Sequence, residues 1–371
     1  MSMEARLDAV IEDAVSGRKT IVGTVVMVAR DGQLVYSRAA GFADREAGVP
    51  VVADTIFRLA SVTKPLVAAT ALAMVERGQL SLDDLAAKYL PYFKPKSPDG
   101  VYRPILIRHL LSHTSGLGYD YPDDPEITSG GQNTDLDYEE NFSRIAKFPL
   151  LFAPGTGWQY SVAIDVLGAI VSAITGGTLE AAVGRYVTGP LGMKDTAFHV
   201  TDGARLATPY YDARPEPLPM ADPQRVQSPD GGATVFSPGR IFNERAFQSG
   251  GAGAVGTAPD FLRFLEALRQ GGGHILKPET VATGFTNQIG TLPRRPQDEG
   301  QRFGFFGAIV TDPAAARSPV AAGTVRWGGS YGHEWFVDRH NGLSVVGFSN
   351  TAFEGSTGQY AFDIRDAVYG A

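Results

Sequence analysis

Residues 57–75 of this 371-residue chain have the sequence FRLASVTKPLVAATALAMV. From Leu66 to Val75 nearly every residue is apolar, so the pattern predicts a helix that is buried on all sides. Pro65 is compatible with a helix that begins close to Ser61, because proline is tolerated in a first turn. A buried central helix is a rigid support for a reactive side chain, and we expect the rest of the fold to surround it.

Ser61 and Lys64 are three residues apart, and residues at this spacing share one face of a helix. The lysine amine can then accept the serine hydroxyl proton or stabilise the alkoxide, which would make Ser61 a nucleophile. A helix that starts near Ser61 also directs unpaired backbone N–H groups and a partial positive charge at the serine oxygen. Ser-x-x-Lys recurs by chance in many chains, so the assignment depends on the rest of the sequence.

Composition and charge restrict the class of protein. Hydrophobic residues make up 43% and charged residues 20% of the chain, as in an ordinary globular protein of one or two domains. The formal net charge of -7, without a dense basic run, argues against a nucleic-acid partner. The longest apolar run, residues 66–75, is far too short to span a bilayer, so no membrane partner is expected. The lack of cysteine excludes disulfides, thiolate metal sites and a cysteine nucleophile.

The N-terminal part of the chain predicts a helix followed by a hairpin. Leu7, Val10 and Ile11 are spaced as one face of an amphipathic helix, and the segment lacks the basic start and apolar core of a signal peptide. We therefore expect a cytoplasmic location. Two β-rich runs, residues 21–29 and 34–40, flank Asp31-Gly32, which is a strong hairpin signal.

The remainder of the chain changes from helical to β character. From about residue 58 to 239 the pattern is helical with long loops, of which the acidic segment 119–144 and the proline-rich segment 209–238 are either solvated excursions or lids over a site. The expected helices are 105–111, 162–174, 261–268 behind the cap-like Thr257-Ala258-Pro259-Asp260, and 357–369; the expected strands are 304–311, 324–327, 334–338 and 343–349.

Strands at both ends with helices between them predict an α+β fold. One antiparallel sheet would be built from both chain ends, flanked by the terminal helices and interrupted by a mostly helical insertion. The expected domains are thus residues 1–57 with 240–371 and residues 58–239, with the active site between them.

Two further elements can complete a site around Ser61 and Lys64. Tyr160 stands just ahead of a predicted helix, and a phenol between an ammonium and a serine hydroxyl can relay a proton to a leaving group. The stretch Trp327-Gly328-Gly329-Ser330 lies on a late strand where the backbone can approach a ligand. A strand N–H there can act with that of Ser61 as an oxyanion hole. Taken singly, Tyr160 could be a turn-flanking aromatic and the glycines a kinked edge strand.

These motifs occur in order along almost the whole chain, and together they are far more specific than any one of them. The ordered set resembles the serine hydrolases of the class C β-lactamase and penicillin-binding-protein superfamily, most closely its esterase branch, the family VIII carboxylesterases. The motifs are Ser61-Val62-Thr63-Lys64, Leu110-Leu111-Ser112-His113-Thr114-Ser115-Gly116-Leu117, Phe152-Ala153-Pro154-Gly155, Tyr160-Ser161, Ser249-Gly250-Gly251-Ala252-Gly253 and Trp327-Gly328-Gly329.

The resemblance implies a β-lactamase-like fold and a set of catalytic roles. Ser61 would be the nucleophile that carries an acyl group, and Lys64 and Tyr160 would be the base and proton relay. The N–H groups of Ser61 and Ser330 would form the oxyanion hole.

Two departures from the β-lactamase pattern favour esters as substrates. Position 162 is Val where these β-lactamases carry the Asn of Tyr-x-Asn, and Trp327-Gly328-Gly329 replaces their Lys-Thr-Gly. Both losses remove polar groups that hold the amide and carboxylate of a β-lactam. We therefore predict a serine carboxylesterase for small- to medium-chain esters, without metal or cofactor. Four other functions stay open: β-lactam hydrolysis, D-amino-acid amide or peptide hydrolysis, acyl transfer to an alcohol, and a catalytically silent binding scaffold.

Several residues are candidates for the substrate-binding surface. His333 and Trp335 follow the glycine-rich strand, and they either line the site mouth, with His333 bonded to an acyl-enzyme or water, or are structural. The other candidates for contact with a substrate are Tyr119, Tyr121, Trp158, Trp327, Gly328 and Gly329.

Three motif matches point to other functions and are rejected. Residues 328–332 match the nucleophile elbow, but a strand rather than a helix is expected after Ser330. Residues 251–256 match a dinucleotide fingerprint without a preceding apolar strand or a later acidic residue. His109 and His113 are four apart without a third ligand, so no metal site is expected.

Overall fold

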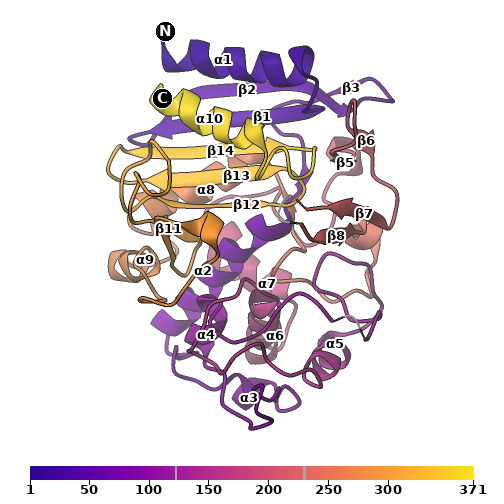
Figure 1. The fold of residues 1–371 in the computed structure, drawn as a ribbon, viewed down its shortest axis with the longest axis vertical. Coiled ribbons are helices and arrows are strands. Elements are labelled where there is room, and N and C mark those ends of the chain that lie inside the picture. The colour runs from indigo at the N-terminus through magenta and orange to yellow at the C-terminus, as the bar shows by residue number, and fades with distance from the viewer. Residues whose placement is uncertain (122, 229–230) are drawn as a thin grey trace.

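The computed structural model describes residues 1–121, 123–228 and 231–371, and its centre there is an eight-stranded antiparallel sheet (Figure 1). Strands from the two ends of the chain meet where the first strand pairs with the last. This confirms the sheet predicted from both chain ends. In sheet order the strands are β10 (Gln301–Phe303), β11 (Ala308–Val310), β12 (Val325–Gly329), β13 (His333–Asp338), β14 (Leu343–Ser349), β1 (Gly23–Arg30), β2 (Gln33–Asp44) and β3 (Val49–Pro50).

The hairpin between β1 and β2 turns at Asp31 and Gly32, as their sequence predicts. Their φ angles are 51° and 86°, so both central residues of this two-residue turn lie in the left-handed region that such hairpins require. Arg30 pairs with Gln33 across the turn, and Arg30 also pairs with Leu343 of β14. The turn thus sets the register in which the N-terminal strands join the C-terminal ones.

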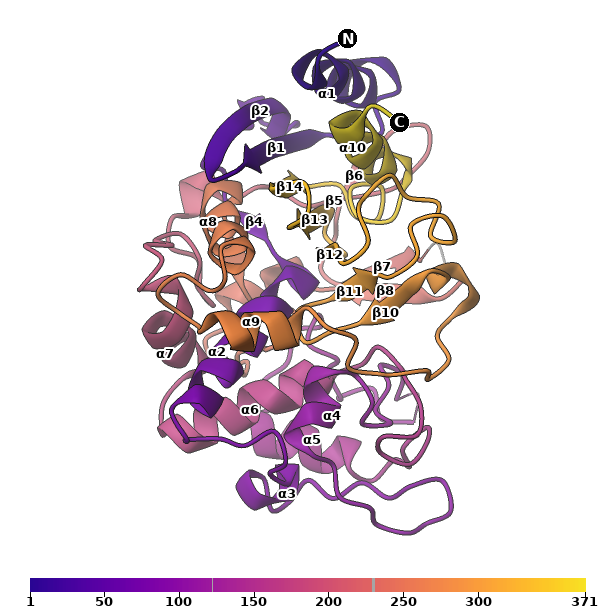
Figure 2. The ribbon, with the colours of Figure 1, turned by 90° about the vertical axis from the view of Figure 1, so that its left-hand side faces the viewer.

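Both faces of the sheet are covered by helices. In β1, Val26 and Val28 belong to a core shared with α1 (Met3–Glu12) and α10 (Gln359–Tyr369). Val25 and Met27 point to the opposite face, where α8 (Ala258–Arg269) packs, because successive side chains of a strand alternate. Figure 2 shows the sheet edge-on, with α1 and α10 together on one side and α8 on the other. The flanking terminal helices are therefore confirmed.

Trp335 lies in the centre of the core on β13, with no exposed surface and its ring 5.8 Å from that of Phe261 on α8. Trp335→Ala is expected to lower the free energy of unfolding by about 3–5 kcal/mol, because it leaves a cavity in a close-packed core. Urea unfolding measures this change. As a control, Leu34→Ala on the exposed side of β2 should stay within about 0.5 kcal/mol of the parent. Equal losses in the two variants would contradict the packing argument.

The helix α2 (Thr63–Glu76) runs from the sheet into the helical part of the molecule (Figures 1 and 2). Every residue from Thr63 to Met74 is buried, which confirms the all-round burial predicted from its apolar run. The other helical segments in the described ranges are α3 (Ala86–Tyr89), α4 (Ile107–Leu111), α5 (Tyr138–Ile145), α6 (Ala163–Thr175), α7 (Leu179–Val183) and α9 (Pro278–Gly284), with short turns at Asp13–Gly17, Ala60–Val62, Gly184–Thr188, Gly203–Arg205, Pro238–Phe242 and Pro296–Asp298.

The apolar helix α6 packs against α2, α4 and α7, and it ends at Gly176, whose φ of 66° closes the helix. It matches the helix predicted over residues 162–174. In the parts of the chain that the structure describes, no single helix is long and apolar enough to cross a membrane. By length and composition α6 qualifies only together with Leu179–Thr188, and the two are bent by 81°.

Two segments expected to be loops contain regular structure. Within 119–144 the helix α5 begins with a capping box, in which Asp137 accepts from the Glu140 N–H and Glu140 accepts from the Asp137 N–H. Asp137 and Glu140 are a local signal that could have predicted this helix. Residues 122, 229 and 230 of these two segments lie outside the described residues. Within 209–238 the chain forms two short hairpins, β5 (Tyr210–Tyr211) with β6 (Leu218–Pro219) and β7 (Gln224–Gln227) with β8 (Ala233–Phe236).

A further strand pair joins residues 57–58, just before Ser61, to residues 255–256. It consists of β4 (Phe57–Arg58) and β9 (Val255–Gly256). This pairing crosses the expected boundary between the helical insertion and the sheet domain near residue 57. The division into residues 1–57 with 240–371 and residues 58–239 stays a prediction.

Asp212, beside β5, carries a pH-dependent contribution to stability. Its carboxylate accepts from the Glu354 N–H at 3.3 Å, and burial raises the pKa of Asp212 from 3.8 to about 7. Between about pH 4 and 7 the folded chain therefore holds a proton that the unfolded chain releases, so this contribution to the free energy of unfolding falls as pH rises. Asp212→Asn should remove that slope, which urea unfolding of both proteins at pH 5 and 7.5 measures. Identical slopes in the two proteins would refute the assignment.

Candidate active site

Ser61 lies in the turn Ala60–Val62, directly before α2, where the end of β12 reaches the helix. Ala60 has a φ of 45°, an unusual left-handed conformation for a residue with a side chain, and such strain is often found beside reactive groups. A Cβ atom at Gly329 would lie 2.3 Å from the Leu59 carbonyl oxygen, so only glycine lets β12 approach this turn. Ser61 is thus held between a helix start and a strand end.

Lys64 is fixed beside the serine from the first turn of α2. Its Nζ donates to Ser61 Oγ at 3.0 Å and to the Gly251 carbonyl at 2.8 Å, and the residue is only 6% exposed. Nζ also lies 4.7 Å from the centre of the Tyr160 ring. The structure therefore brings together the three residues predicted to be catalytic, with Nζ at proton-transfer distance from the nucleophile.

Tyr160 is held by aromatic neighbours from three parts of the chain. Its hydroxyl accepts from Trp327 Nε1 at 3.0 Å, and the two rings are 4.9 Å apart. The rings of Tyr119 and His113 lie 5.5 and 4.7 Å from it. Burial and the neighbouring Tyr160 raise the pKa of Tyr119 well above its ordinary value, so Tyr119 stays a neutral phenol. Tyr119 and Trp327, both predicted from the sequence, thus belong to the site.

Trp327→Phe tests the hydrogen bond from the indole to Tyr160. The substitution keeps an aromatic ring and removes the only N–H that donates to the Tyr160 oxygen among the described residues. Since that donor stabilises negative charge on the oxygen, kcat for an ester should fall by about 10- to 100-fold with little change in KM. Steady-state kinetics on a p-nitrophenyl ester measure both constants. An unchanged kcat would show that the hydrogen bond has no part in catalysis.

The two N–H groups of the expected oxyanion hole are free to bind a ligand. The Gly332 N–H donates to the Gly329 carbonyl at 2.9 Å and closes a tight turn with Ser330 at its corner. In the described parts of the chain, neither the Ser61 N–H nor the Ser330 N–H has a hydrogen-bond partner. The strand β13 begins at His333, so no helix follows Ser330 and the nucleophile-elbow interpretation fails as predicted.

His113 supports Tyr160 from inside the protein. Its Nδ1 accepts from the Ser161 N–H at 3.2 Å, next to the catalytic tyrosine. Burial, with Lys64 and Arg294 nearby, lowers the pKa of His113 well below its ordinary value, so the imidazole is neutral. Within residues 1–121, 123–228 and 231–371, no three histidine, aspartate or glutamate side chains are grouped so as to hold a metal ion.

Asp165 is a part of the site that the sequence analysis missed. Its buried carboxylate accepts from the Gly251 N–H at 3.1 Å and from the Ser249 hydroxyl, and so fixes the loop whose carbonyl holds Lys64. A Cβ atom at Gly251 would lie 2.2 Å from this carboxylate, which explains the glycine. Burial raises the pKa of Asp165, and the charge of Lys64 opposes that shift. The Ser249-Gly250-Gly251 motif was the available signal, but its partner lies 84 residues away from Ser249.

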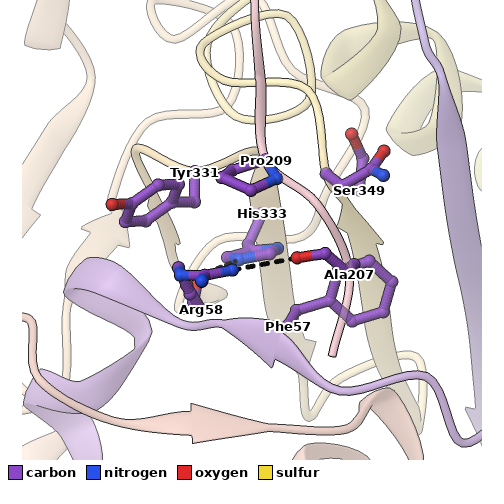
Figure 3. Close-up of a pocket in the computed structure, with 8 residues that line it drawn as sticks. Phe57, Arg58, Ala207, Pro209, Tyr331, His333 and Ser349 are labelled. Carbon is purple, nitrogen blue, oxygen red and sulfur yellow. Dashed lines mark hydrogen bonds between the residues drawn. The ribbon is translucent and has the colours of Figure 1, made fainter. Parts of the chain in front are cut away.

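The expectation that His333 lines the site mouth is wrong. His333 is fully buried, and its Nε2 lies 2.7 Å from the Arg58 carbonyl. Its ring packs against Phe57 and Phe348, because the side chain of the first β13 residue points into the core. Figure 3 shows it beside Arg58 and Tyr331 in a small cavity. Trp335 is likewise a buried core residue, so of its two interpretations the structural one is correct.

Two other residues predicted to contact a substrate, Trp158 and Tyr121, make contacts with other parts of the protein. Trp158 is buried, with its ring 5.4 Å from that of Phe303 and the Arg294 guanidinium 4.4 Å above it. The partly buried Tyr121 packs against Phe148 and donates from its hydroxyl to the Gly118 carbonyl at 3.3 Å. Burial leaves Trp158 little surface for a substrate, and a substrate contact of Tyr121 stays a prediction.

A pocket adjoins the oxyanion hole. Its lining includes Ser330, which carries one of the two N–H groups, and Ala60, which precedes the residue that carries the other. Both long segments singled out in the sequence contribute to it as well, with Gly130 from the first and residues 234–238 from the second. These segments thus form pocket wall, whether or not they also move.

Comparisons with known proteins give the family and the fold of the chain. The β-lactamase family model matches residues 7–369. The chain is 48% identical to Esterase EstB of Burkholderia gladioli over 99% of this chain and 95% of that protein, and 30% identical to the Lovastatin esterase of Penicillium rubens over 92% and 91%. A solved structure titled "EstCE1, a hydrolase with promiscuous acyltransferase activity" superposes with a TM-score of 0.94, 41% identity and coverage of 99% and 98%. The expected α+β fold is therefore confirmed, and the chain belongs to the β-lactamase family.

Proposed function

We propose that the protein is a serine carboxylesterase that hydrolyses small- to medium-chain esters through an acyl-enzyme on Ser61. The observation that carries the proposal is the 3.0 Å hydrogen bond from Lys64 Nζ to Ser61 Oγ, beside two unpaired N–H groups. Within the β-lactamase family, the Trp327-Gly328-Gly329 strand supports placement in the esterase branch, family VIII. The cytoplasmic location stays a prediction.

The first half of the reaction forms the acyl-enzyme. Lys64 takes the hydroxyl proton as Ser61 Oγ attacks the ester carbonyl, and the developing oxyanion accepts from the Ser61 and Ser330 N–H groups. Tyr160, in contact with Lys64, passes its hydroxyl proton to the departing alcohol as the C–O bond to that alcohol breaks, and regains a proton from Lys64.

The second half releases the acid. Water attacks the acyl carbonyl, and its proton passes through Tyr160 to Lys64. The same two N–H groups stabilise the second oxyanion. Collapse of this intermediate breaks the acyl–Ser61 bond and returns the proton to Oγ. No step needs a group that the chain does not supply.

The named relatives support an ester as the substrate. Two of them carry esterase names, and they match this chain almost from end to end. Val162, where a β-lactamase of class C has an amide, is fully buried and offers no polar group to a β-lactam side chain. The small-molecule ester is therefore our proposed ligand, in preference to a lactam or a D-amino-acid amide.

Acyl transfer to an alcohol is a second candidate function. It shares the acyl-enzyme and differs only in the nucleophile of the second half-reaction. The EstCE1 structure, whose title names acyltransferase activity, favours acyl transfer over lactam or D-amino-acid amide hydrolysis as this second function. Adding a primary alcohol to the assay should yield a new ester if the acyl-enzyme accepts it in competition with water.

The proposal is tested with a p-nitrophenyl ester series and a chromogenic cephalosporin. We expect cleavage of acetate to hexanoate esters and little turnover of the cephalosporin. A fluorophosphonate probe should label the folded protein on Ser61. Failure of both labelling and ester cleavage by correctly folded protein would instead favour a catalytically silent binding scaffold.

A further inference from the structure

Two arginines in the pocket beside the oxyanion hole, Arg58 and Arg240, form no salt bridge with any of the described residues. Arg58 donates from Nε to the Pro238 carbonyl and from Nη1 to the Ala207 carbonyl, each at 2.9 Å; the second bond is drawn in Figure 3. Arg240 is 8% exposed and donates to two backbone carbonyls, those of Gln132 and Phe247. In the described residues neither guanidinium forms a salt bridge, and Arg58 Nη2 donates no hydrogen bond.

This lack of salt bridges contrasts with three other buried or half-buried arginines among the described residues. Arg269 pairs with Glu266 at 2.8 Å, Arg326 with Glu334 at 2.9 Å, and Arg365 with Asp366. A cation taken out of water without a counter-ion is unfavourable, and carbonyl oxygens replace only part of its hydration. Burial accordingly lowers the pKa of Arg58, and lowers that of Arg240 to about 10. The charges of Asp222 and Asp165 oppose these two shifts only in part, so the pocket holds two buried guanidinium groups without a direct ion pair among the described residues.

The position of the pocket decides which part of an ester occupies it. The leaving alcohol must lie near Tyr160, which gives it a proton. Neither Tyr160 nor Trp327 belongs to the lining of the pocket, whereas Ala60 and Ser330 do. The acyl group therefore extends into the pocket from the carbonyl carbon held at the oxyanion hole.

The walls of the pocket suit a hydrocarbon chain that ends in an anion. Phe198, Phe236 and Phe247 give it apolar surface for methylene groups. Arg58 and Arg240 also belong to its lining, and a guanidinium with free N–H groups is the side chain that best matches a carboxylate.

We propose that this pocket binds an acyl group with a terminal carboxylate, so that monoesters of aliphatic dicarboxylic acids are the preferred substrates. The inference rests on the proposed esterase function and narrows it to a substrate class. The terminal carboxylate accepts from N–H groups of Arg58 and Arg240, and supplies the direct ion pair that these arginines lack among the described residues.

The kinetic test compares two esters with the same six-carbon acyl chain, p-nitrophenyl hexanoate and p-nitrophenyl hydrogen adipate. Wild type should have a kcat/KM at least 10-fold higher for the adipate monoester. In Arg58→Met and Arg240→Met this preference should fall by about 10-fold, mainly through KM, because a charged hydrogen-bonded contact is lost. Arg58→Lys should retain part of it. Arg365→Met, at a buried arginine on α10, is the matched control and should keep the wild-type preference.

Because Arg58 also bridges two carbonyls, its variants could fold poorly, and binding is therefore measured without turnover as well. Monomethyl adipate, but not methyl hexanoate, which lacks the terminal carboxylate, should raise the melting temperature of Ser61→Ala, and added salt should weaken the effect. The double variant Ser61→Ala with Arg240→Met should lose this shift.

Failure of the esterase function and failure of the carboxylate site would give different results. If neither p-nitrophenyl ester is cleaved but monomethyl adipate still stabilises Ser61→Ala, the esterase function falls and the carboxylate site remains. If p-nitrophenyl hexanoate is cleaved as well as the adipate monoester, and monomethyl adipate gives no thermal shift, the carboxylate site is refuted while the esterase function stands. In that case the arginines serve only to hold the backbone carbonyls.

Discussion

Ser61→Ala is expected to lower kcat for a p-nitrophenyl ester by about 10⁴-fold or more, because the variant has no atom that can form the acyl-enzyme. The oxyanion N–H groups and the pocket stay in place, so KM should change little. Initial-rate kinetics at high enzyme concentration measure the residual rate. A matched loss of fluorophosphonate labelling would locate the covalent step on the same residue.

The control for this prediction is Ser330→Ala. The backbone N–H of residue 330, and not its hydroxyl, is assigned to the oxyanion hole, and it survives the substitution. Activity should therefore stay within a few-fold of wild type. Full activity in Ser61→Ala, or its loss in Ser330→Ala, would move the nucleophile to Ser330 and overturn the assignment.

Lys64→Met is expected to lower kcat by about 10³- to 10⁴-fold with little change in KM. The substitution keeps a long side chain in a buried position and removes the amine that lies 3.0 Å from Ser61 Oγ. Ser61 then has no base within hydrogen-bond distance among the described residues. Lys88→Met is the control, because Lys88 is exposed and pairs only with Asp84 and Tyr89 in the described chain, and it should leave kcat unchanged.

The free energy of unfolding of Lys64→Met should also depend on pH, because the charge of Lys64 acts on the pKa of Asp165. Lys64 opposes the rise that burial causes in the pKa of Asp165, so this pKa should be higher still in Lys64→Met. The folded variant then binds a proton more tightly than the unfolded chain does. Relative to wild type, its free energy of unfolding should therefore fall as pH rises above the ordinary range of an aspartate. A pH-independent difference would contradict this coupling.

Local patterns were sufficient to predict most of the scaffold. The unbroken apolar run after Pro65 specified a helix without an exposed face, and Asp31-Gly32 specified a two-residue hairpin, because few other residues tolerate positive φ at both positions. The ordered motifs also located Ser61, Lys64 and Tyr160. These signals are readable because each depends on residues that are close in the sequence.

Contacts between distant segments were not readable in the same way. Asp165 acts on Lys64 through Gly251, and nothing near Asp165 in the sequence indicates that partner. The prediction that His333 lines the site mouth was wrong for a related reason. Strand alternation does not show which face of a strand is core until the sheet and its covering helices are known.

The sequence by itself determined the proposed catalytic residues of this protein, since Ser61, Lys64, Tyr160 and the strand of the expected oxyanion hole are recognisable from residue type and order. Only the tertiary structure decided the environment of that chemistry. Two arginines 182 positions apart along the chain, Arg58 and Arg240, line one pocket without a salt bridge to any described residue. The physical reason is that charge compensation depends on distance in space, and a linear sequence does not contain those distances.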